Sequence, residues 1–209
     1  MNTAVTGLQG KQDSFRYETV SFADEALILV DEEDQVTGYD SKQSTHAGDG
    51  KLHRAFSVFL FDGPDWVLLQ CRADGKPLWP GYWANSCCSH PRRGELIDEA
   101  AQRRLGDELG AYSKLQKLYS FRYRARYLDR GTDHELCSVY VGHYGRDMPL
   151  HVNREEISDY GWFSRAEIDR EIAAGKRDFA PWFLLEWEQL KQHRDALEAL
   201  SLGALKRAG

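Results

Sequence analysis

Residues 97–110 read IDEAAQRRLGDELG, a stretch with regularly spaced apolar and charged side chains. Apolar residues recur at every fourth position from Ile97 to Leu109, while arginines and carboxylates fill the other positions. This spacing predicts an amphipathic helix with one buried side. We expect the helix to end at Gly110, because glycine readily adopts the left-handed conformation that follows a helix.

Segments rich in β-forming residues lie on both sides of this helix in the chain. The predicted strands are residues 26–30, an extended segment that follows the turn 31–35 and ends near residue 42, then 55–61, 66–70, 119–127, 136–144 and 161–163. Turn residues at 62–65 and 129–132 indicate hairpins. Further helices are predicted at 165–174 and from 181 to about 200. This order predicts an α+β fold or a mixed β-sheet sandwiched between α-helices.

Length and charge limit the possible classes of protein. The chain has 209 residues and a formal net charge of −6, which fits one compact domain and gives no general attraction to nucleic acid. We expect a flexible arm at 1–16, a single domain at 17–200 and a tail at 201–209. Because long apolar runs and a signal-peptide start are missing, we expect a cytoplasmic protein without a membrane segment. We also expect reduced cysteines and a monomer or weak homodimer.

The central helix belongs to a longer pattern that resembles the Nudix box. The pattern reads Ser89-x5-Glu95-x7-Arg103-Arg104-Leu105-x-Asp107-Glu108-x-Gly110. In that family, carboxylates hold magnesium on a bound diphosphate, so Glu108 is the predicted Mg²⁺ contact. The chain departs from the box at Ser89, Arg104 and Asp107, where the box has glycine, glutamate and glutamate. The alternative is a solvated helix in which Arg104 and Glu108 form an ordinary i,i+4 ion pair.

Three histidines and two carboxylates form a second candidate site. His46, His53 and His90 are expected in loops or at strand edges. Asp133 and Glu135 alternate along an extended segment, so their side chains point to the same side. Such ligands suit manganese, zinc or magnesium, and the number of nitrogens favours the transition metals. Taken singly, each histidine is more often a hydrogen-bonded surface or core residue than a metal ligand.

Several separated segments accompany these two sites. They are His46 and His53 at seven-residue spacing, residues 52–57, Arg72 with Lys76, and residues 79–86, 88–91, 95–110, 121–125, 133–135 and 179–182. This set is similar to that of type I isopentenyl-diphosphate delta-isomerases over residues 27–187. The resemblance implies a Nudix fold and an enzyme that interconverts isopentenyl and dimethylallyl diphosphate by a 1,3-allylic rearrangement in isoprenoid biosynthesis.

The resemblance also implies roles for individual residues. Cys88 and Glu135 would be the catalytic pair, and the protein ligands of Mn²⁺ or Zn²⁺ would be His46, His53, His90, Asp133 and Glu135. Glu108 would hold Mg²⁺ against the diphosphate of the substrate, with Arg72 and Lys76 as cationic contacts. The family usually has glutamate at the position of Asp133. Aspartate is one methylene shorter, so metal choice or affinity is expected to change there.

The implied reaction explains why these residue types are needed. An acid and a base must flank the substrate, and a π face must meet a cationic transition state. The Cys88 thiol and a metal-bound Glu135 can handle the two protons, and Tyr123 can relay one of them. Trp182 is the candidate for the ring that faces the cation. Inert packing is the alternative for Cys88 and the preferred role for Cys87.

Two other functions share some of these features. A Nudix hydrolase would use the same helix to cleave a diphosphate, but Arg104 in place of a box carboxylate, together with Cys88 and Trp182, argues against it. A non-catalytic diphosphate-binding module would have to lack catalytic groups, and only Asp133 hints at such a loss. Hydrolysis releases phosphate and isomerisation does not, so phosphate release distinguishes the two enzymes.

Overall fold

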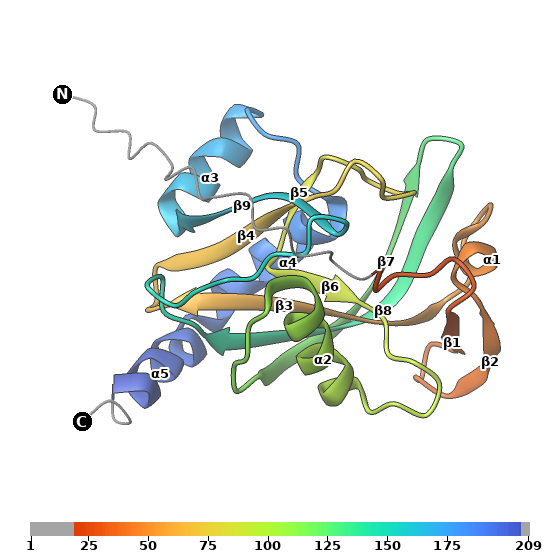
Figure 1. The fold of residues 1–209 in the computed structure, drawn as a ribbon, viewed down its shortest axis with the longest axis horizontal. Coiled ribbons are helices and arrows are strands. Elements are labelled where there is room, and N and C mark those ends of the chain that lie inside the picture. Colours follow the sequence, from red (N-terminus) through yellow and green to blue (C-terminus); the bar gives the residue numbers. More distant parts are fainter. Residues whose placement is uncertain (1–18, 206–209) are drawn as a thin grey trace.

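The computed structural model describes residues 19–205, and its strands form one nine-stranded mixed sheet (Figure 1). The strands are β1 (Ala26–Val30), β2 (Val36–Ser41), β3 (His53–Asp62), β4 (Trp66–Arg72), β5 (Trp83–Ala84), β6 (Cys87–Ser89), β7 (Gln116–Tyr127), β8 (Gly131–His143) and β9 (Ile157–Ser164). The helices are α1 (Lys42–His46), α2 (Ile97–Leu109), α3 (Arg165–Ala174), α4 (Pro181–Leu190) and α5 (Arg194–Leu205). The predicted arm at 1–16 and residues 206–209 lie outside the described part.

Strands β3 and β8 form the centre of the sheet. They pair in parallel from His53 opposite Glu135 to Phe61 opposite His143, while β7 pairs with β8 as an antiparallel hairpin. On the other side of β3 lie β4 and β6, both antiparallel to it. Strand β9 pairs with β4. The mixed sheet predicted from the sequence is therefore confirmed, and the parallel pairing of β3 with β8 joins segments far apart in the chain.

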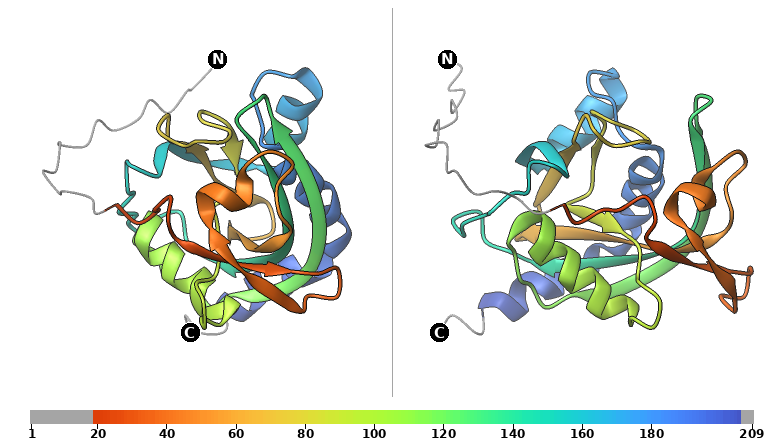
Figure 2. Two further views of the ribbon diagram at one scale, coloured as in Figure 1. Left: turned by 90° about the vertical axis from the view of Figure 1, so that its right-hand side faces the viewer. Right: turned by 45° about the vertical axis from the view of Figure 1, so that its right-hand side comes forward.

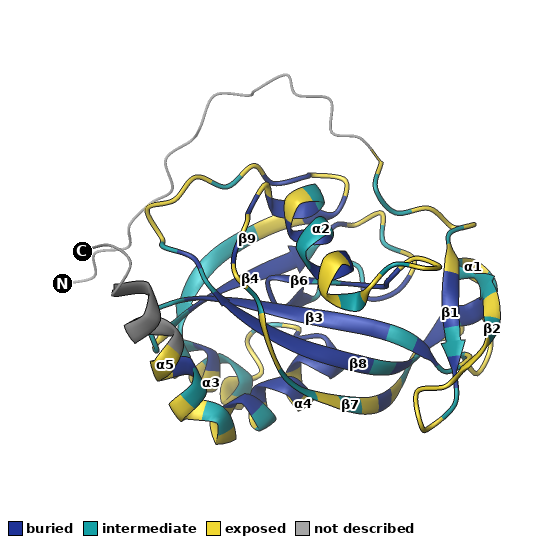
Figure 3. Ribbon diagram, turned by 90° about the horizontal axis from the view of Figure 1, so that it is seen from below, coloured by how far each residue is buried: buried dark blue, intermediate teal, exposed yellow. Residues whose placement is uncertain are grey.

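Helices cover the two faces of this sheet and close a core on each. One core lies under α2 and includes Leu105 and Leu109, whereas the other lies under α3, α4 and α5 and includes Phe183 and Trp187. Figure 3 shows the buried strands β3 and β8 between these two helical layers. Each core gains stability in proportion to the apolar area removed from water. The predicted arrangement of a sheet between helices is confirmed.

Helix α2 forms as its apolar spacing predicts. Its N-terminal turn carries Asp98 and Glu99, which interact favourably with the positive end of the helix dipole. At its C-terminus, Gly110 adopts the left-handed conformation at φ 61° and its N–H bonds to the carbonyls of Gly106 and Leu105. The helix boundary predicted from the sequence is thus confirmed.

Other boundaries differ from the predictions. The expected helix 181–200 is interrupted by a 3₁₀ turn at Lys191–His193, where His193 stacks on Tyr119 of β7. Helix α1 begins at Lys42, where only the end of a strand was expected, and it is capped by the side chain of Ser41. These differences arise from caps and tertiary contacts that leave no periodic pattern. Among the described residues, none of the helices combines the length and apolar character needed to cross a bilayer.

The curved β7–β8 hairpin lies beside α1 in both views of Figure 2. Thr132 of β8 donates a hydrogen bond from Oγ1 to the carbonyl of Gly48, just after α1, at 2.6 Å. This contact places the end of α1 against the part of β8 that carries Asp133 and Glu135.

Candidate metal centre and proton-transfer site

Three imidazole rings converge at one end of the sheet. His46 ends α1, His53 begins β3 and His90 follows β6. Their ring centroids lie 4.8–5.5 Å apart. Together with Glu135 of β8 they offer four ligand atoms that all lie within 4.8 Å of one another. The structure therefore brings together four of the five predicted ligands of the histidine site in a group that could hold one ion.

Hydrogen bonds fix the orientation of two of these rings. His46 Nδ1 donates to the carbonyl of Lys42 at 2.7 Å, and His53 Nδ1 donates to the carbonyl of Lys51 at 2.8 Å. A carbonyl only accepts, so each Nε2 keeps a free lone pair, as in metal sites where a backbone group orients the ligand. His53 Nε2 and His90 Nδ1 are buried without a hydrogen-bond partner in the described structure. Orphaned buried nitrogens of this kind fit a bound cation.

Burial keeps the His46 and His90 rings neutral. It lowers the pKa of His46 to about 4, an effect increased by the neighbouring His53, and it holds the pKa of His90 well below its usual value. Neutral imidazole is the form that binds a metal ion. The donor set of nitrogens and carboxylate oxygen therefore fits Mn²⁺ or Zn²⁺.

The two carboxylates of β8 have different partners. Glu135 Oε1 lies 3.2 Å from His90 Nε2 and 3.6 Å from His53 Nε2, and its Oε2 accepts a hydrogen bond from the Tyr123 hydroxyl at 2.8 Å. Asp133 stands outside the group of four. Its Oδ1 lies 3.4 Å from His46 Nε2, and its Oδ2 accepts a bond from the indole of Trp79 at 3.0 Å.

These surroundings shift the pKa values of the two carboxyl groups in opposite directions. Burial and the adjacent Glu135 raise the pKa of Asp133 to about 7. Burial alone would also raise the pKa of Glu135, but the adjacent imidazoles of His53 and His90 outweigh it and hold that pKa well below the usual range. Glu135 is therefore the more fully ionised of the two carboxyl groups at neutral pH.

Strand β6 presents its two cysteines to opposite faces of the sheet. Cys87 is fully buried in the core under α2, whereas Cys88 is partly exposed and packs on the side of α4. The predicted packing role of Cys87 is confirmed. Burial raises the pKa of the Cys88 thiol to about 12 against the opposing effect of Arg72, so the group is a protonated thiol at neutral pH.

Arg72 connects Cys88 to an aromatic wall. Its Nη1 donates to Cys88 Sγ at 3.7 Å, and its guanidinium lies 5.2 Å from the centroid of the Trp182 ring. That ring lies 6.3 Å from those of Tyr123 and Trp79. A continuous set of contacts thus runs from Cys88 through Arg72, Trp182 and Tyr123 to Glu135.

The helix that carries the Nudix-like pattern contains a buried ion pair. Arg104 Nε donates to Glu108 at 3.0 Å, and Arg104 Nη2 lies 3.3 Å from Glu156. The alternative interpretation of the box is right about the ion pair of Arg104 with Glu108 and wrong about its solvation, because both side chains are only 3% exposed. Glu108 as a magnesium contact stays a prediction.

Lysine side chains extend this charged cluster. Lys76 pairs with Glu156. Burial, together with the positive charges of Lys76 and Arg104, lowers the pKa of Lys42 to about 8. Sequence reasoning missed Lys42 and Glu156. Lys42 lies four residues before His46, and its carbonyl orients the His46 ring. The i,i+4 spacing of the two residues on a helix could therefore have indicated from the sequence that Lys42 lies beside the site.

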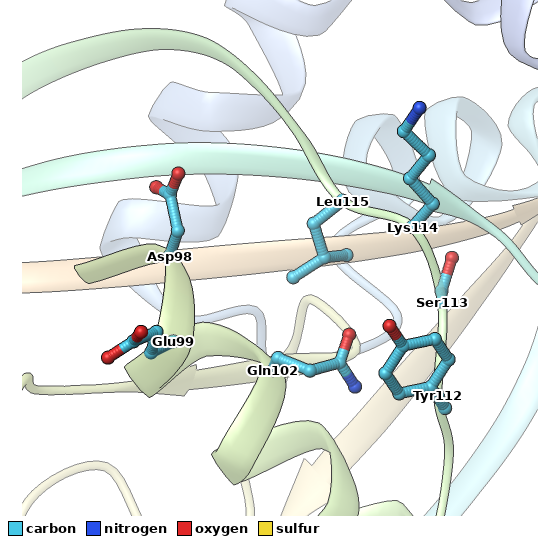
Figure 4. A pocket seen from close by; sticks show the side chains of 7 residues that line it. All are labelled: Asp98, Glu99, Gln102, Tyr112, Ser113, Lys114 and Leu115. Carbon is cyan, nitrogen blue, oxygen red and sulfur yellow. The ribbon is translucent and has the colours of Figure 1, made fainter. Parts of the chain in front are cut away.

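A separate surface pocket lies between the start of α2 and the segment that follows it (Figure 4). It is lined by Asp98, Glu99, Gln102, Tyr112, Ser113, Lys114 and Leu115. None of the predicted site residues lines it, so it is distinct from the metal centre.

Comparison with known proteins identifies the family. The NUDIX domain model matches residues 51–183. The chain is 41% identical to isopentenyl-diphosphate Delta-isomerase 1 of Photorhabdus laumondii over 83% of its own length and 99% of the relative. It is 42% identical to isopentenyl-diphosphate Delta-isomerase of Serratia proteamaculans over 77% and 88% of the two chains.

Solved structures support the fold. A crystal structure from Deinococcus radiodurans aligns with a TM-score of 0.62 at 23% identity, covering 77% of this chain and 96% of the other. A MutT NUDIX hydrolase from Burkholderia pseudomallei aligns with a TM-score of 0.53 at 16% identity, covering 66% and 97%. At such low sequence identities, the structural similarity establishes the fold alone. The function has to be argued from the site and from the relatives with higher identity. The chain belongs to the type I isopentenyl-diphosphate delta-isomerase family, built on a Nudix domain.

Proposed function

We propose that the protein interconverts isopentenyl diphosphate and dimethylallyl diphosphate. The observation that carries this proposal is the set of contacts linking a partly exposed thiol, Cys88, to a buried carboxylate, Glu135, along an aromatic wall. An allylic rearrangement needs two proton-handling groups and a surface that tolerates positive charge, and this region contains both.

The proton balance assigns paired roles to Cys88 and Glu135. One proton is added to carbon 4 of isopentenyl diphosphate and another is removed from carbon 2, so the double bond moves without net loss of atoms. Because the reaction is reversible, the group that donates in one direction accepts in the other. Tyr123, hydrogen-bonded to Glu135, is placed to pass a proton, since a hydroxyl both donates and accepts.

The ring of Trp182 supplies the π face. It is 4% exposed, and its Nε1 donates to Asn85 Oδ1 at 3.1 Å, which fixes the orientation of the indole. A desolvated cation–π contact is worth about 2 kcal/mol. The ring therefore favours a tertiary carbocation over the neutral alkene and offers it no nucleophile.

The metal centre would be held by His46, His53, His90 and Glu135, with Asp133 as a fifth ligand. Bound Mn²⁺ or Zn²⁺ would supply positive charge that biases the protonation of Glu135. We propose that Mg²⁺ enters with the substrate diphosphate near Glu108.

The cationic cluster is the proposed anchor for the diphosphate. Lys42 and Lys76 gather next to Arg104, and a diphosphate would replace part of the carboxylate pairing in this cluster. Arg72 donates three N–H groups, to the carbonyls of Leu78 and Trp79 and to the sulfur of Cys88. A guanidinium has five N–H groups. Donors therefore remain on Arg72 for an anion beside Cys88.

Proton NMR in deuterated water tests the proposal. Purified protein with Mn²⁺ and Mg²⁺ is incubated with isopentenyl diphosphate, and we expect dimethylallyl diphosphate to appear with deuterium entering carbons 2 and 4. Phosphorus NMR of the same sample should show an intact diphosphate. Release of phosphate without allylic product would instead identify a hydrolase, and unchanged substrate would contradict both activities.

A further inference from the structure

Trp79 has a strained backbone next to the metal centre. Its φ is 53°, in the left-handed region that bulky side chains rarely occupy. It also precedes Pro80, which further restricts its conformation. Such a conformation is unfavourable and persists only where the surrounding structure holds it.

Hydrogen bonds from Arg72 hold this conformation in place. Arg72 Nε donates to the Trp79 carbonyl at 3.1 Å, and Nη2 donates to the Leu78 carbonyl at 2.9 Å. The backbone N–H of Gly81 donates to the Arg72 carbonyl at 3.0 Å, and that of Arg72 donates to Tyr82 at 2.9 Å. The turn is therefore tied at both ends to one residue of β4.

The strained turn directs the indole of Trp79 to a carboxylate. Its Nε1 donates to Asp133 Oδ2 at 3.0 Å, in a contact where both residues are buried. The other oxygen, Oδ1, is thereby left facing His46 Nε2 at 3.4 Å. A buried indole N–H needs a partner, so breaking this contact carries a desolvation cost on both sides.

We infer that Trp79 is a positioning residue that holds Asp133 toward the ion bound by His46, His53, His90 and Glu135. The inference rests on the proposed metal centre. The aspartate side chain is one methylene shorter than glutamate, and fixing Oδ2 through Trp79 leaves Oδ1 directed at His46 Nε2. Groups that orient a ligand in this way typically change metal affinity by about 10–100-fold.

Simple packing is the competing role, because Trp79 also packs against the ring of Tyr127 at 4.6 Å and that of Tyr82 at 5.3 Å. The two roles differ in their dependence on Asp133. A packing role lowers metal affinity by the same factor whether or not Asp133 is present, whereas a positioning role has no effect once Asp133 is removed.

The test is a double-mutant cycle on metal affinity, measured with purified metal-free protein titrated with Mn²⁺ and, separately, with Zn²⁺. Trp79→Phe keeps an aromatic ring and removes the N–H, and we expect about 10–100-fold weaker binding. In an Asp133→Ala background, adding Trp79→Phe should change the affinity less than twofold. Circular dichroism and thermal melting establish that each variant is folded before titration.

Trp83→Phe is the matched control, since Trp83 is 9% exposed, Trp79 is 8% exposed and both lie in the same short segment. We expect its metal affinity to equal that of the parent. An undiminished affinity of Trp79→Phe, or an equal loss in the Asp133→Ala background, would overturn the inference while leaving the metal centre intact. A parent protein that takes up neither ion would refute the metal centre itself and this inference with it.

Discussion

Cys87 and Cys88 are adjacent, yet the pleat of β6 gives them different surroundings. Side chains of a strand alternate between faces, so Cys87 enters the core under α2 while Cys88 faces Arg72 and the aromatic wall. Residue type alone does not distinguish them. The two cysteines differ in the face of the sheet to which their side chains point. The alternation of side chains along a strand allowed this difference to be predicted from the sequence.

Substituting each cysteine by alanine should separate chemistry from packing. Cys88→Ala removes a proposed proton-handling group, so turnover should fall by more than about 100-fold, the usual contribution of a general acid or base. Cys87→Ala deletes one buried atom and should keep turnover within about threefold, with a stability loss of about 1 kcal/mol. Turnover by NMR and urea unfolding measure the two effects. An active Cys88→Ala enzyme would contradict the proposed role.

Glu186 is a buried carboxyl group outside the proposed proton path. It lies on α4 with Cys137 Sγ 3.7 Å from its Oε1, and its Oε2 has no hydrogen-bond partner in the described structure. Burial raises its pKa from 4.5 to about 8, an effect to which Glu135 adds. The folded protein therefore keeps a proton on Glu186 that the unfolded chain releases at lower pH.

This difference makes stability depend on pH. Between about pH 4.5 and pH 8 the folded state binds more protons than the unfolded state, so the Glu186 contribution to unfolding free energy falls by about 1.4 kcal/mol per pH unit. Glu186→Gln removes the ionisable group and should be more stable than the parent at pH 8, with a smaller difference at pH 5. Urea unfolding of the parent and of Glu186→Gln over this pH range measures the difference in their free energies of unfolding. Glu188→Gln, on the exposed side of α4, should show no such pH-dependent gain.

At the scale of elements, α2 is a helix whose position and C-terminal end could be predicted from the local sequence. Its apolar period, its acidic first turn and its terminal glycine are local signals, and all three agree with the structure. By contrast, α1, the short strands β5 and β6, and the break before α5 depend on caps and on contacts with distant segments. Short elements contain too few residues for a period to be recognised.

Gly106 within α2 and Gly110 directly after it give a direct test of where the helix ends. Gly110→Ala should destabilise the protein by about 1–3 kcal/mol, because φ is 61° and an added Cβ would lie 2.7 Å from that of His151. Gly106→Ala should stabilise it by about 0.5–1 kcal/mol, since the position is helical and no atom lies within 4 Å of an added Cβ. Chemical unfolding measures the change in stability of each variant. Equal changes in the two variants would refute this assignment of the helix end.

At the scale of the whole molecule, the candidate metal centre is assembled from α1, β3, the segment after β6, and β8. Residue types and the family resemblance indicated which histidines and carboxylates to consider. The i,i+4 spacing indicated the pair of Arg104 and Glu108, but the sequence did not indicate that this pair would be buried or that Glu156 and Lys42 would join it. Such placements depend on how distant segments pack, which no local spacing encodes.

Removing the metal should affect both activity and stability. Excess chelator should abolish isomerisation, and Mn²⁺ with Mg²⁺ should restore it. Because an ion that binds only the folded state stabilises it by mass action, we expect a lower melting temperature after chelation, with a shift that depends on free Mn²⁺ concentration. Melting curves over a Mn²⁺ series provide the measurement. Full activity in excess chelator would contradict the proposed centre.

The parallel pairing of β3 with β8 also has a consequence for biosynthesis. His53 and Glu135 lie opposite each other in this ladder, roughly eighty positions apart in the chain, and such distant pairings form late because loop closure must precede them. If the proposed centre binds an ion, a ribosome must extend the chain past β8 before that ion can be captured. We expect refolding rates to be insensitive to Mn²⁺ and unfolding rates to fall in its presence, as stopped-flow tryptophan fluorescence can measure. Metal loading would then be the final step of maturation.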